Sequence, residues 1–220
     1  MLNKSKGNMY PWVTHTWNPI RGKCPHDCSY CYMKRYPQPN LHLDEKSLRD
    51  DLGSGNVIFV GSSCDMWADG IIVEWIELVL EHCRIHPQNT YLFQSKNPQR
   101  IIDWTCDLPP KSLIGTTIET NRTYSHETYK APYRQARYIA MTKYAGHKMV
   151  SIEPIIDFDT ELMVDWIAQI KPDFVSIGAD SGDNHLPEPS WPKVQSLIKE
   201  LEQLTEVKLK ANLRRLEGTQ

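Results

Sequence analysis

The sequence predicts an α/β protein with a mostly parallel sheet. Two observations carry this prediction. Short runs rich in β-branched and aromatic residues alternate with helical patterns almost throughout the 220 residues. Polar residues also recur just past the expected strand ends, where the carboxyl edge of a parallel sheet gathers ligand-binding groups.

The expected strands are short apolar runs bounded by turn residues. They cover residues 12–17, 56–60, 90–93, 113–117, 149–152, 174–177 and 207–209. The clearest helix covers residues 71–86, where apolar residues fall on one face before Pro87. Further helices are expected after Asn97, Asp159 and Ser190, each of which can act as an N-cap.

The bulk composition bounds the function. A formal net charge of -2 argues against a broad basic face for non-specific nucleic-acid binding, although a local groove stays possible. No apolar run resembles a signal peptide or a membrane span, so we expect a cytoplasmic protein without a membrane partner. No linker or repeat divides residues 1–220, which predicts a single domain.

The polar residues past the strand ends form a candidate site. For any one of them, ordinary loop polarity explains the residue equally well, but the repetition over successive strands favours binding. The set consists of Ser62, Ser63, Asp65, Gln94, Ser95, Lys96, Thr117, Glu119, Asn121, Glu153, Asp180, Ser181, Lys210 and Asn212.

The loop 22–32 carries three closely spaced cysteines, Cys24, Cys28 and Cys31. A structural zinc site wants four protein ligands, so His26, His15 or a remote cysteine would have to complete it. A cubane iron–sulfur cluster on three thiolates leaves one iron open, which suits an enzyme whose substrate must bind iron. The spacing therefore favours catalysis, with zinc as the alternative.

The pattern Cys-x3-Cys-x2-Cys, with the aromatic Tyr30 before the last cysteine, resembles the signature of the radical S-adenosylmethionine (SAM) superfamily. Segments 16–19, 59–62, 115–121, 151–154 and 178–182 resemble a phage-associated radical-SAM-like family of uncharacterised function. The resemblance implies a partial (β/α)6-type barrel with one 4Fe–4S cluster on Cys24, Cys28 and Cys31. It also implies SAM as cofactor, cleaved reductively to a 5'-deoxyadenosyl radical that abstracts hydrogen from a substrate.

The resemblance further implies an electron donor of the flavodoxin or ferredoxin type. The substrate is unknown, with a nucleotide or nucleic acid possible. No cysteine follows Cys106, so we expect no auxiliary-cluster domain. The rival hypotheses are a zinc-stabilised binding module and an iron–sulfur electron carrier or redox sensor without SAM chemistry.

Individual SAM contacts are carried over from the superfamily by position. Tyr30 is expected to flank the adenine, with simple aromatic packing as the alternative. Lys96, a point charge on a flexible stem, is expected to pair with the SAM carboxylate, with an ordinary solvated lysine as the alternative. The amino group maps to Gly61, Ser62, Ser63 and Asp65, and the ribose to Thr117, Glu119 and Asn121, with Glu153 as the alternative. The stretch containing Gly178, Asp180 and Ser181 suits a close backbone approach to the cofactor.

The remaining cysteines divide by position. Cys83 lies on the apolar helix face and should be core, and Cys106 is expected to be buried too. Cys64 follows a strand at the proposed mouth, so it either packs or donates a hydrogen atom to a substrate radical. The basic residues Arg134, Arg137, Lys143 and Lys148 are expected on solvated helix faces.

Overall fold

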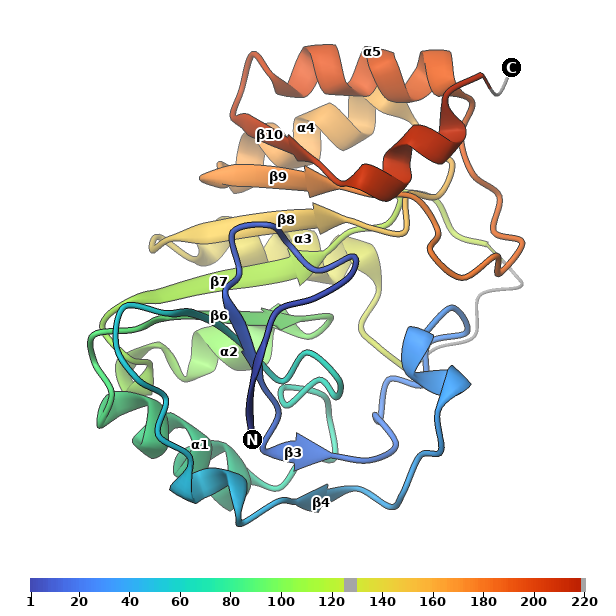
Figure 1. The fold of residues 1–220 in the computed structure, drawn as a ribbon. Coiled ribbons are helices and arrows are strands. Elements are labelled where there is room, and N and C mark those ends of the chain that lie inside the picture. Colours follow the sequence, from blue (N-terminus) through green and yellow to red (C-terminus); the bar gives the residue numbers. More distant parts are fainter. Residues whose placement is uncertain (125–129, 219–220) are drawn as a thin grey trace.

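The computed structural model describes residues 1–124 and 130–218. Its main sheet has eight strands in the order β1-β2-β5-β6-β7-β8-β9-β10. Figure 1 shows β6 to β10 side by side in this order. Only the pairing of β1 with β2 is antiparallel. The bounds are β1 (Leu2–Lys4), β2 (His15–Trp17), β5 (Val57–Val60), β6 (Thr90–Ser95), β7 (Ser112–Thr117), β8 (Lys148–Ile152), β9 (Phe174–Ile177) and β10 (Glu206–Leu209). The predicted mostly parallel α/β sheet is confirmed.

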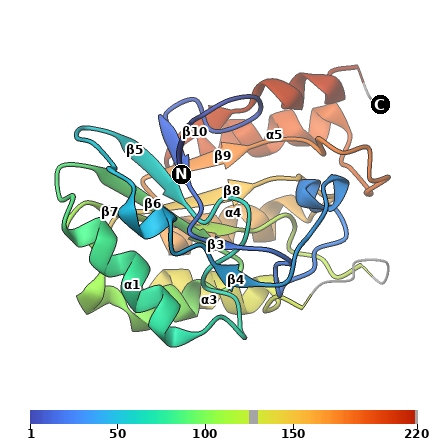
Figure 2. The same cartoon turned by 60° about the horizontal axis from the view of Figure 1, so that its bottom comes forward.

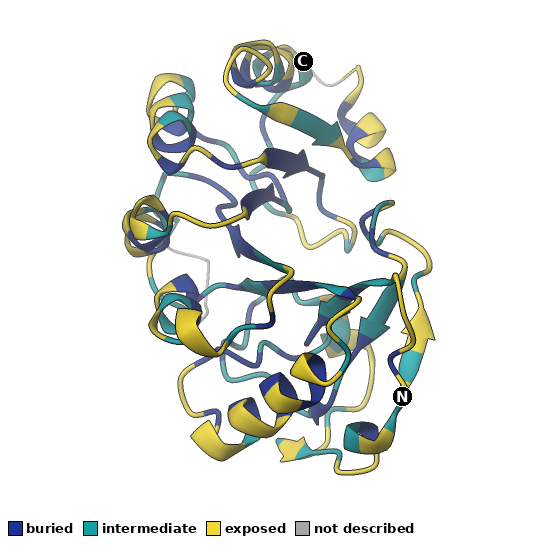
Figure 3. Cartoon of the chain, turned by 90° about the vertical axis from the view of Figure 1, so that its left-hand side faces the viewer, coloured by how far each residue is buried: buried dark blue, intermediate teal, exposed yellow. Residues whose placement is uncertain are grey.

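The helices of the crossover connections cover the outer face of this sheet (Figures 1 and 3). They are α1 (Val73–Arg84), α2 (Pro98–Asp103), α3 (Arg134–Lys143), α4 (Thr160–Ile170) and α5 (Trp191–Leu201). All but α3 were predicted. The buried side of α3 includes Arg134 and Arg137 rather than a stripe of apolar residues, so the apolar periodicity that reveals a helix is weak there.

Smaller elements occupy the long connection between β2 and β5. Strands β3 (Ile20–Arg21) and β4 (His42–Leu43) form a separate two-stranded antiparallel sheet. The 3-10 helices η1 (Tyr32–Arg35) and η2 (Ser47–Arg49) also lie in this connection, whereas η3 (Thr105–Asp107) follows α2 and η4 (Ala211–Leu216) follows β10. Figure 2 shows β3 and β4 of this connection, drawn in blue, near the centre of the view.

The two faces of the main sheet differ in what covers them. Side chains facing the helices, such as Phe93 and Val150, belong to the larger apolar core, because alternate residues of a strand point to opposite faces. On the concave face, Leu92 and Met149 pack with Tyr10 from the N-terminal segment. This part of the concave face is thus apolar and is covered by the N-terminal segment of the same chain.

Cys83 and Cys106, which lie outside the cysteine loop, were both predicted to be buried. Cys83 is fully buried in the core, as predicted. Cys106 is exposed, so the prediction of a buried thiol was wrong, because η3 carries it on the surface after the short α2. Among the described residues, no helix is long and apolar enough to cross a membrane.

Candidate active site at the mouth of the sheet

The cysteine loop 22–32 lies over the carboxyl ends of the central strands. Cys24, Cys28 and Cys31 are all free thiols, and the charges of Cys24 and Cys31 reach Cys28. Burial, opposed by the charge of Lys96, raises the pKa of Cys28 to about 11. Three unpaired soft sulfur donors on one short loop fit the ligand set of an iron–sulfur cluster.

A zinc ligand set is not assembled within residues 1–124 and 130–218. No three His, Cys, Asp or Glu side chains there gather closely enough to hold a single metal ion. His26, the expected fourth zinc ligand, is 3% exposed and has its Nε2 2.9 Å from Oδ2 of Asp65. A cubane cluster does not require its three thiolates to converge on one metal ion, because each thiolate binds a different iron.

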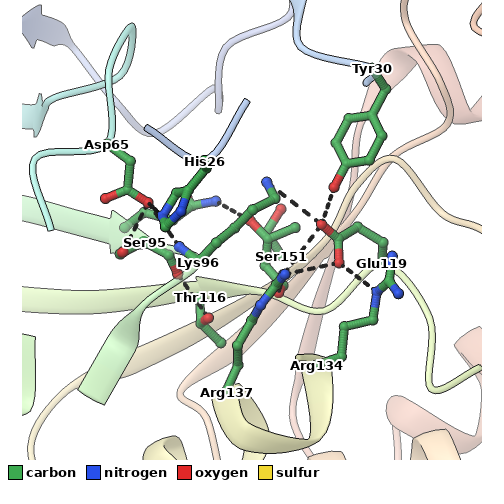
Figure 4. Close-up of polar contacts among 12 residues, drawn as sticks. His26, Tyr30, Asp65, Ser95, Lys96, Thr116, Glu119, Arg134, Arg137 and Ser151 are labelled. Atoms are coloured by element: carbon green, nitrogen blue, oxygen red, sulfur yellow. Dashed lines mark hydrogen bonds and ion pairs between the residues drawn. The ribbon is translucent and has the colours of Figure 1, made fainter. Parts of the chain in front are cut away.

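Asp65 accepts hydrogen bonds from several directions (Figure 4). Its Oδ2 lies 2.9 Å from His26 Nε2, from Ser95 Oγ and from the backbone nitrogen of Lys96. Its Oδ1 accepts from the backbone N–H of Trp67 at 3.0 Å. Burial opposes its ionisation, but the hydrogen bond and charge of His26 with the other donors keep the pKa of this carboxyl below its usual range.

Glu119 is the second buried carboxylate of the mouth. It is fully buried, with Arg134 Nε 2.9 Å and Arg137 Nη1 3.1 Å from its Oε2. The hydroxyl of Tyr30 donates to its Oε1 (Figure 4). Burial alone would raise its pKa, but Arg137, Lys96 and Arg134 hold the pKa well below the ordinary value.

The prediction that Arg134, Arg137 and Lys148 lie on solvated helix faces is wrong. Arg134 is 7% exposed, Arg137 is fully buried and Lys148 is 7% exposed, so none of them lies on a solvated helix face. Lys148 donates to the backbone oxygens of Met141 and Tyr144 at the end of α3. Positive charge is retained in the interior because Glu119 and these carbonyls solvate it.

Lys96 connects the two carboxylates. Its backbone N–H binds Asp65, while its Nζ lies 3.6 Å from Glu119 Oε1 and 5.4 Å from the ring centroid of Tyr30. Burial lowers its pKa, but the charges of Cys28 and Glu119 outweigh that effect and raise it. The side chain is 17% exposed and therefore holds a cation beside Cys28 at the edge of solvent.

Cys64 is 2% exposed and its thiol lies beside that of Cys24. The neighbouring Cys64 thiol lowers the pKa of Cys24, while the Cys24 thiol and burial raise the pKa of Cys64. The predicted role of Cys64 as a hydrogen-atom donor stays a prediction. Its position does show that it lies against a proposed cluster ligand.

Glu153, directly after β8, is the third carboxylate of the mouth whose two oxygens both have hydrogen-bond partners. Its Oε2 lies 2.7 Å from Lys210 Nζ, and its Oε1 accepts from Asn8 at 2.9 Å and from Asn212 at 3.1 Å. A Cβ added at Gly178 would stand 2.7 Å from the Glu153 carboxyl carbon. The close approach expected at Gly178 thus accommodates Glu153 of the chain itself.

The other predicted SAM-binding residues lie either near the cysteine loop or on the concave face of the sheet. Ser62 and Ser63 are held near the cysteine loop by Asn18 Oδ1, which accepts from Ser62 Oγ at 3.2 Å and from Ser63 N at 2.9 Å. Gly61 has a φ of 77°, which a side chain would strain. Thr117 Oγ1 accepts from Gln94 Nε2 at 3.1 Å on the concave face.

Three predicted residues bind neighbouring loops. Asn121 exchanges hydrogen bonds with the backbone of Asp159 before α4. Asp180 accepts from the backbone N–H groups of Gly182 and Asn184, which closes its own turn. Ser181 Oγ accepts from Asn8 and Asn212, both at 2.9 Å. Their predicted contacts with SAM stay predictions.

Several residues of the site escaped the sequence analysis. His26 was considered only as a zinc ligand, and Tyr10, whose hydroxyl oxygen lies 2.9 Å from Gln94 Oε1 and from Ser151 Oγ, was not considered at all. Arg134 and Arg137 stand three residues apart, a spacing that places both on one helix face. That spacing was the one available signal that they act together.

Solved structures with the same fold define the class of the protein. One variant of spore photoproduct lyase matches with a TM-score of 0.68 at 11% identity, over 92% of this chain and 78% of that chain. Another, with bound AdoMet and dinucleoside spore photoproduct, matches with a TM-score of 0.59 at 12% identity, over 90% of this chain. This chain spans 64% of the length of that variant. The protein therefore has the α/β fold of spore photoproduct lyase.

The family follows from the sequence match. The family described as Protein of unknown function (DUF5131) matches residues 8–203, so the chain belongs to it. No curated protein matches the chain. The predicted phage association stays a prediction.

Proposed function

We propose that the protein is a radical SAM enzyme that holds one 4Fe–4S cluster on Cys24, Cys28 and Cys31. The observation that carries the proposal is the placement of three free thiols on one loop at the mouth of the sheet, with the partly exposed Lys96 ammonium beside Cys28. When bound, the cluster would supply the electron that cleaves SAM to methionine and a 5'-deoxyadenosyl radical. A hydrogen atom would then be taken from the substrate.

Lys96 is the residue best placed to hold the SAM carboxylate. Its Nζ forms an ion pair with Glu119 at 3.6 Å, beyond hydrogen-bond length, and donates no hydrogen bond to any residue in 1–124 and 130–218. An ammonium has three donors, so it can bind a carboxylate that arrives beside Cys28. Ser62 and Ser63, fixed by Asn18, follow β5 at the same edge of the sheet and are the residues we assign to the SAM amino group.

The substrate class belongs to the proposal as well. The fold relatives include structures of spore photoproduct lyase with dinucleoside spore photoproduct. A nucleotide or nucleic acid therefore comes first as the substrate to test, with reducing equivalents from a flavodoxin or ferredoxin. The net charge of -2 favours a locally contacted nucleotide over a long nucleic-acid footprint.

The test is anaerobic reconstitution followed by assay of SAM cleavage. We expect brown protein with iron and sulfide for one cubane per chain, and 5'-deoxyadenosine with methionine after reduction with dithionite. Cys28→Ala should lose both signals, while the matched change Cys83→Ala, at a core thiol, should keep them. Colourless protein with stoichiometric zinc would overturn the proposal. An intact cluster that neither responds to SAM nor yields 5'-deoxyadenosine would favour the electron carrier.

A further inference from the structure

Two side chains of the cysteine loop, His26 and Tyr30, bind carboxylates that follow strands of the main sheet, and they flank Cys28 symmetrically. His26 stands two residues before Cys28, and Tyr30 stands two residues after it. His26 Nε2 lies 2.9 Å from Asp65, after β5, and the Tyr30 hydroxyl donates to Glu119, after β7. Figure 4 shows both residues reaching from the loop toward these carboxylates.

Both carboxylates are themselves fixed. Asp65 is held by Ser95 Oγ and the Lys96 backbone at the end of β6, both at 2.9 Å. Glu119, without exposed surface, is held from α3 by Arg134 at 2.9 Å and Arg137 at 3.1 Å. Neither can follow a movement of the loop without breaking charge-assisted hydrogen bonds.

Lys96 links the two anchoring carboxylates, Asp65 and Glu119. Lys96 donates its backbone N–H to Asp65 and directs its Nζ toward Glu119 and the ring of Tyr30. The loop is fastened once more by its own backbone, because His26 O accepts from Lys130 N at 2.7 Å. The segment around Cys28 is thus restrained on both sides.

Resting on the proposed function, we propose that His26 and Tyr30 are positioning residues that hold Cys28 ready for the cluster. Ordering a free loop at the moment of binding costs conformational entropy, and a loop already restrained avoids most of that cost. Hydrogen bonds that orient a ligand from behind commonly change metal affinity 10–100-fold. In this arrangement Asp65 and Glu119 would affect cluster binding indirectly, by restraining the loop that carries Cys28.

The test compares two tyrosines of the same loop. Tyr30→Phe removes only the hydroxyl that binds Glu119. Tyr32→Phe is the matched control: its hydroxyl also binds the edge of the sheet, at the backbone oxygen of Ser62 3.1 Å away, but the residue is 49% exposed and water can replace that hydrogen bond. After anaerobic reconstitution, the rate of iron release to a ferrous chelator and the EPR spectrum of the reduced cluster are measured. We expect release roughly tenfold or more faster for Tyr30→Phe and unchanged for Tyr32→Phe.

His26→Leu tests the other side, since it fills the buried space without donating to Asp65. We expect faster iron release again, with broadened EPR lines, while circular dichroism shows that the cluster-free variants remain folded. Folded variants that release iron at the wild-type rate would overturn the inference and leave the proposed function standing. Wild-type protein that takes up no iron would overturn both.

Discussion

Glu119→Gln is the substitution whose cost follows most directly from the structure. The change replaces a fully buried carboxylate by a neutral amide and leaves Lys96, Arg134 and Arg137 around it. Removing one partner of a buried ion pair typically costs about 3–5 kcal/mol, because the opposite charge stays desolvated. In a chain of this size each kcal/mol lowers Tm by roughly 2–4 °C. We therefore expect Tm to fall by roughly 6–20 °C.

Thermal unfolding of the cluster-free protein, followed by circular dichroism, measures this cost without any contribution from iron. Glu81→Gln is the matched control, because Glu81 is exposed on α1 and the same chemical change there should alter stability by less than about 1 kcal/mol. Equal Tm values for Glu119→Gln and wild type would refute the reasoning. They would mean that the buried cations are solvated well enough without the carboxylate.

The same pair of proteins predicts a pH dependence. The pKa of Glu119 is depressed in the folded state, whereas a glutamate in the unfolded chain titrates near about 4.3. The ionised carboxylate therefore contributes its full stabilisation above that pH and loses it as the pH falls toward the folded pKa. The stability gap between wild type and Glu119→Gln should be constant from neutral pH to about 5 and shrink below about 4. A gap that widens on acidification would contradict the assigned ion pairs.

Substitutions at two further positions, Gly178 and Cys64, test the mouth of the sheet. Gly178→Ala should destabilise the protein by about 1–3 kcal/mol in urea titration, because its Cβ would displace the Glu153 carboxyl, 2.7 Å away, from Lys210. An unchanged unfolding midpoint would show that Glu153 moves freely. Cys64→Ser and Cys64→Ala should both keep the iron content of wild type, since Cys64 is expected to lie beside a ligand without being one. Loss of iron in either variant would make Cys64 a fourth ligand.

The sequence was sufficient for the features that depend on local patterns. Strands β5 to β10 and helices α1, α2, α4 and α5 were predicted because their apolar residues repeat at the period of a strand or helix. The cysteine loop was identified because three thiols within eight residues, a donor type that metals prefer, need no distant partner. The parallel order of the sheet followed from the alternation of these elements.

Only the tertiary structure decided which polar groups pair. Arg134 and Glu119 are fifteen residues apart, and Lys210 and Glu153 are fifty-seven apart, so no short-range pattern links them. A charged residue in a sequence is most often solvated, and it becomes internal only when folding brings an opposite charge to it. For this reason Arg137 was expected at the surface and lies fully buried beneath the site. His26 likewise changed from a possible zinc ligand to the partner of Asp65 once β5 placed that carboxylate beside the loop.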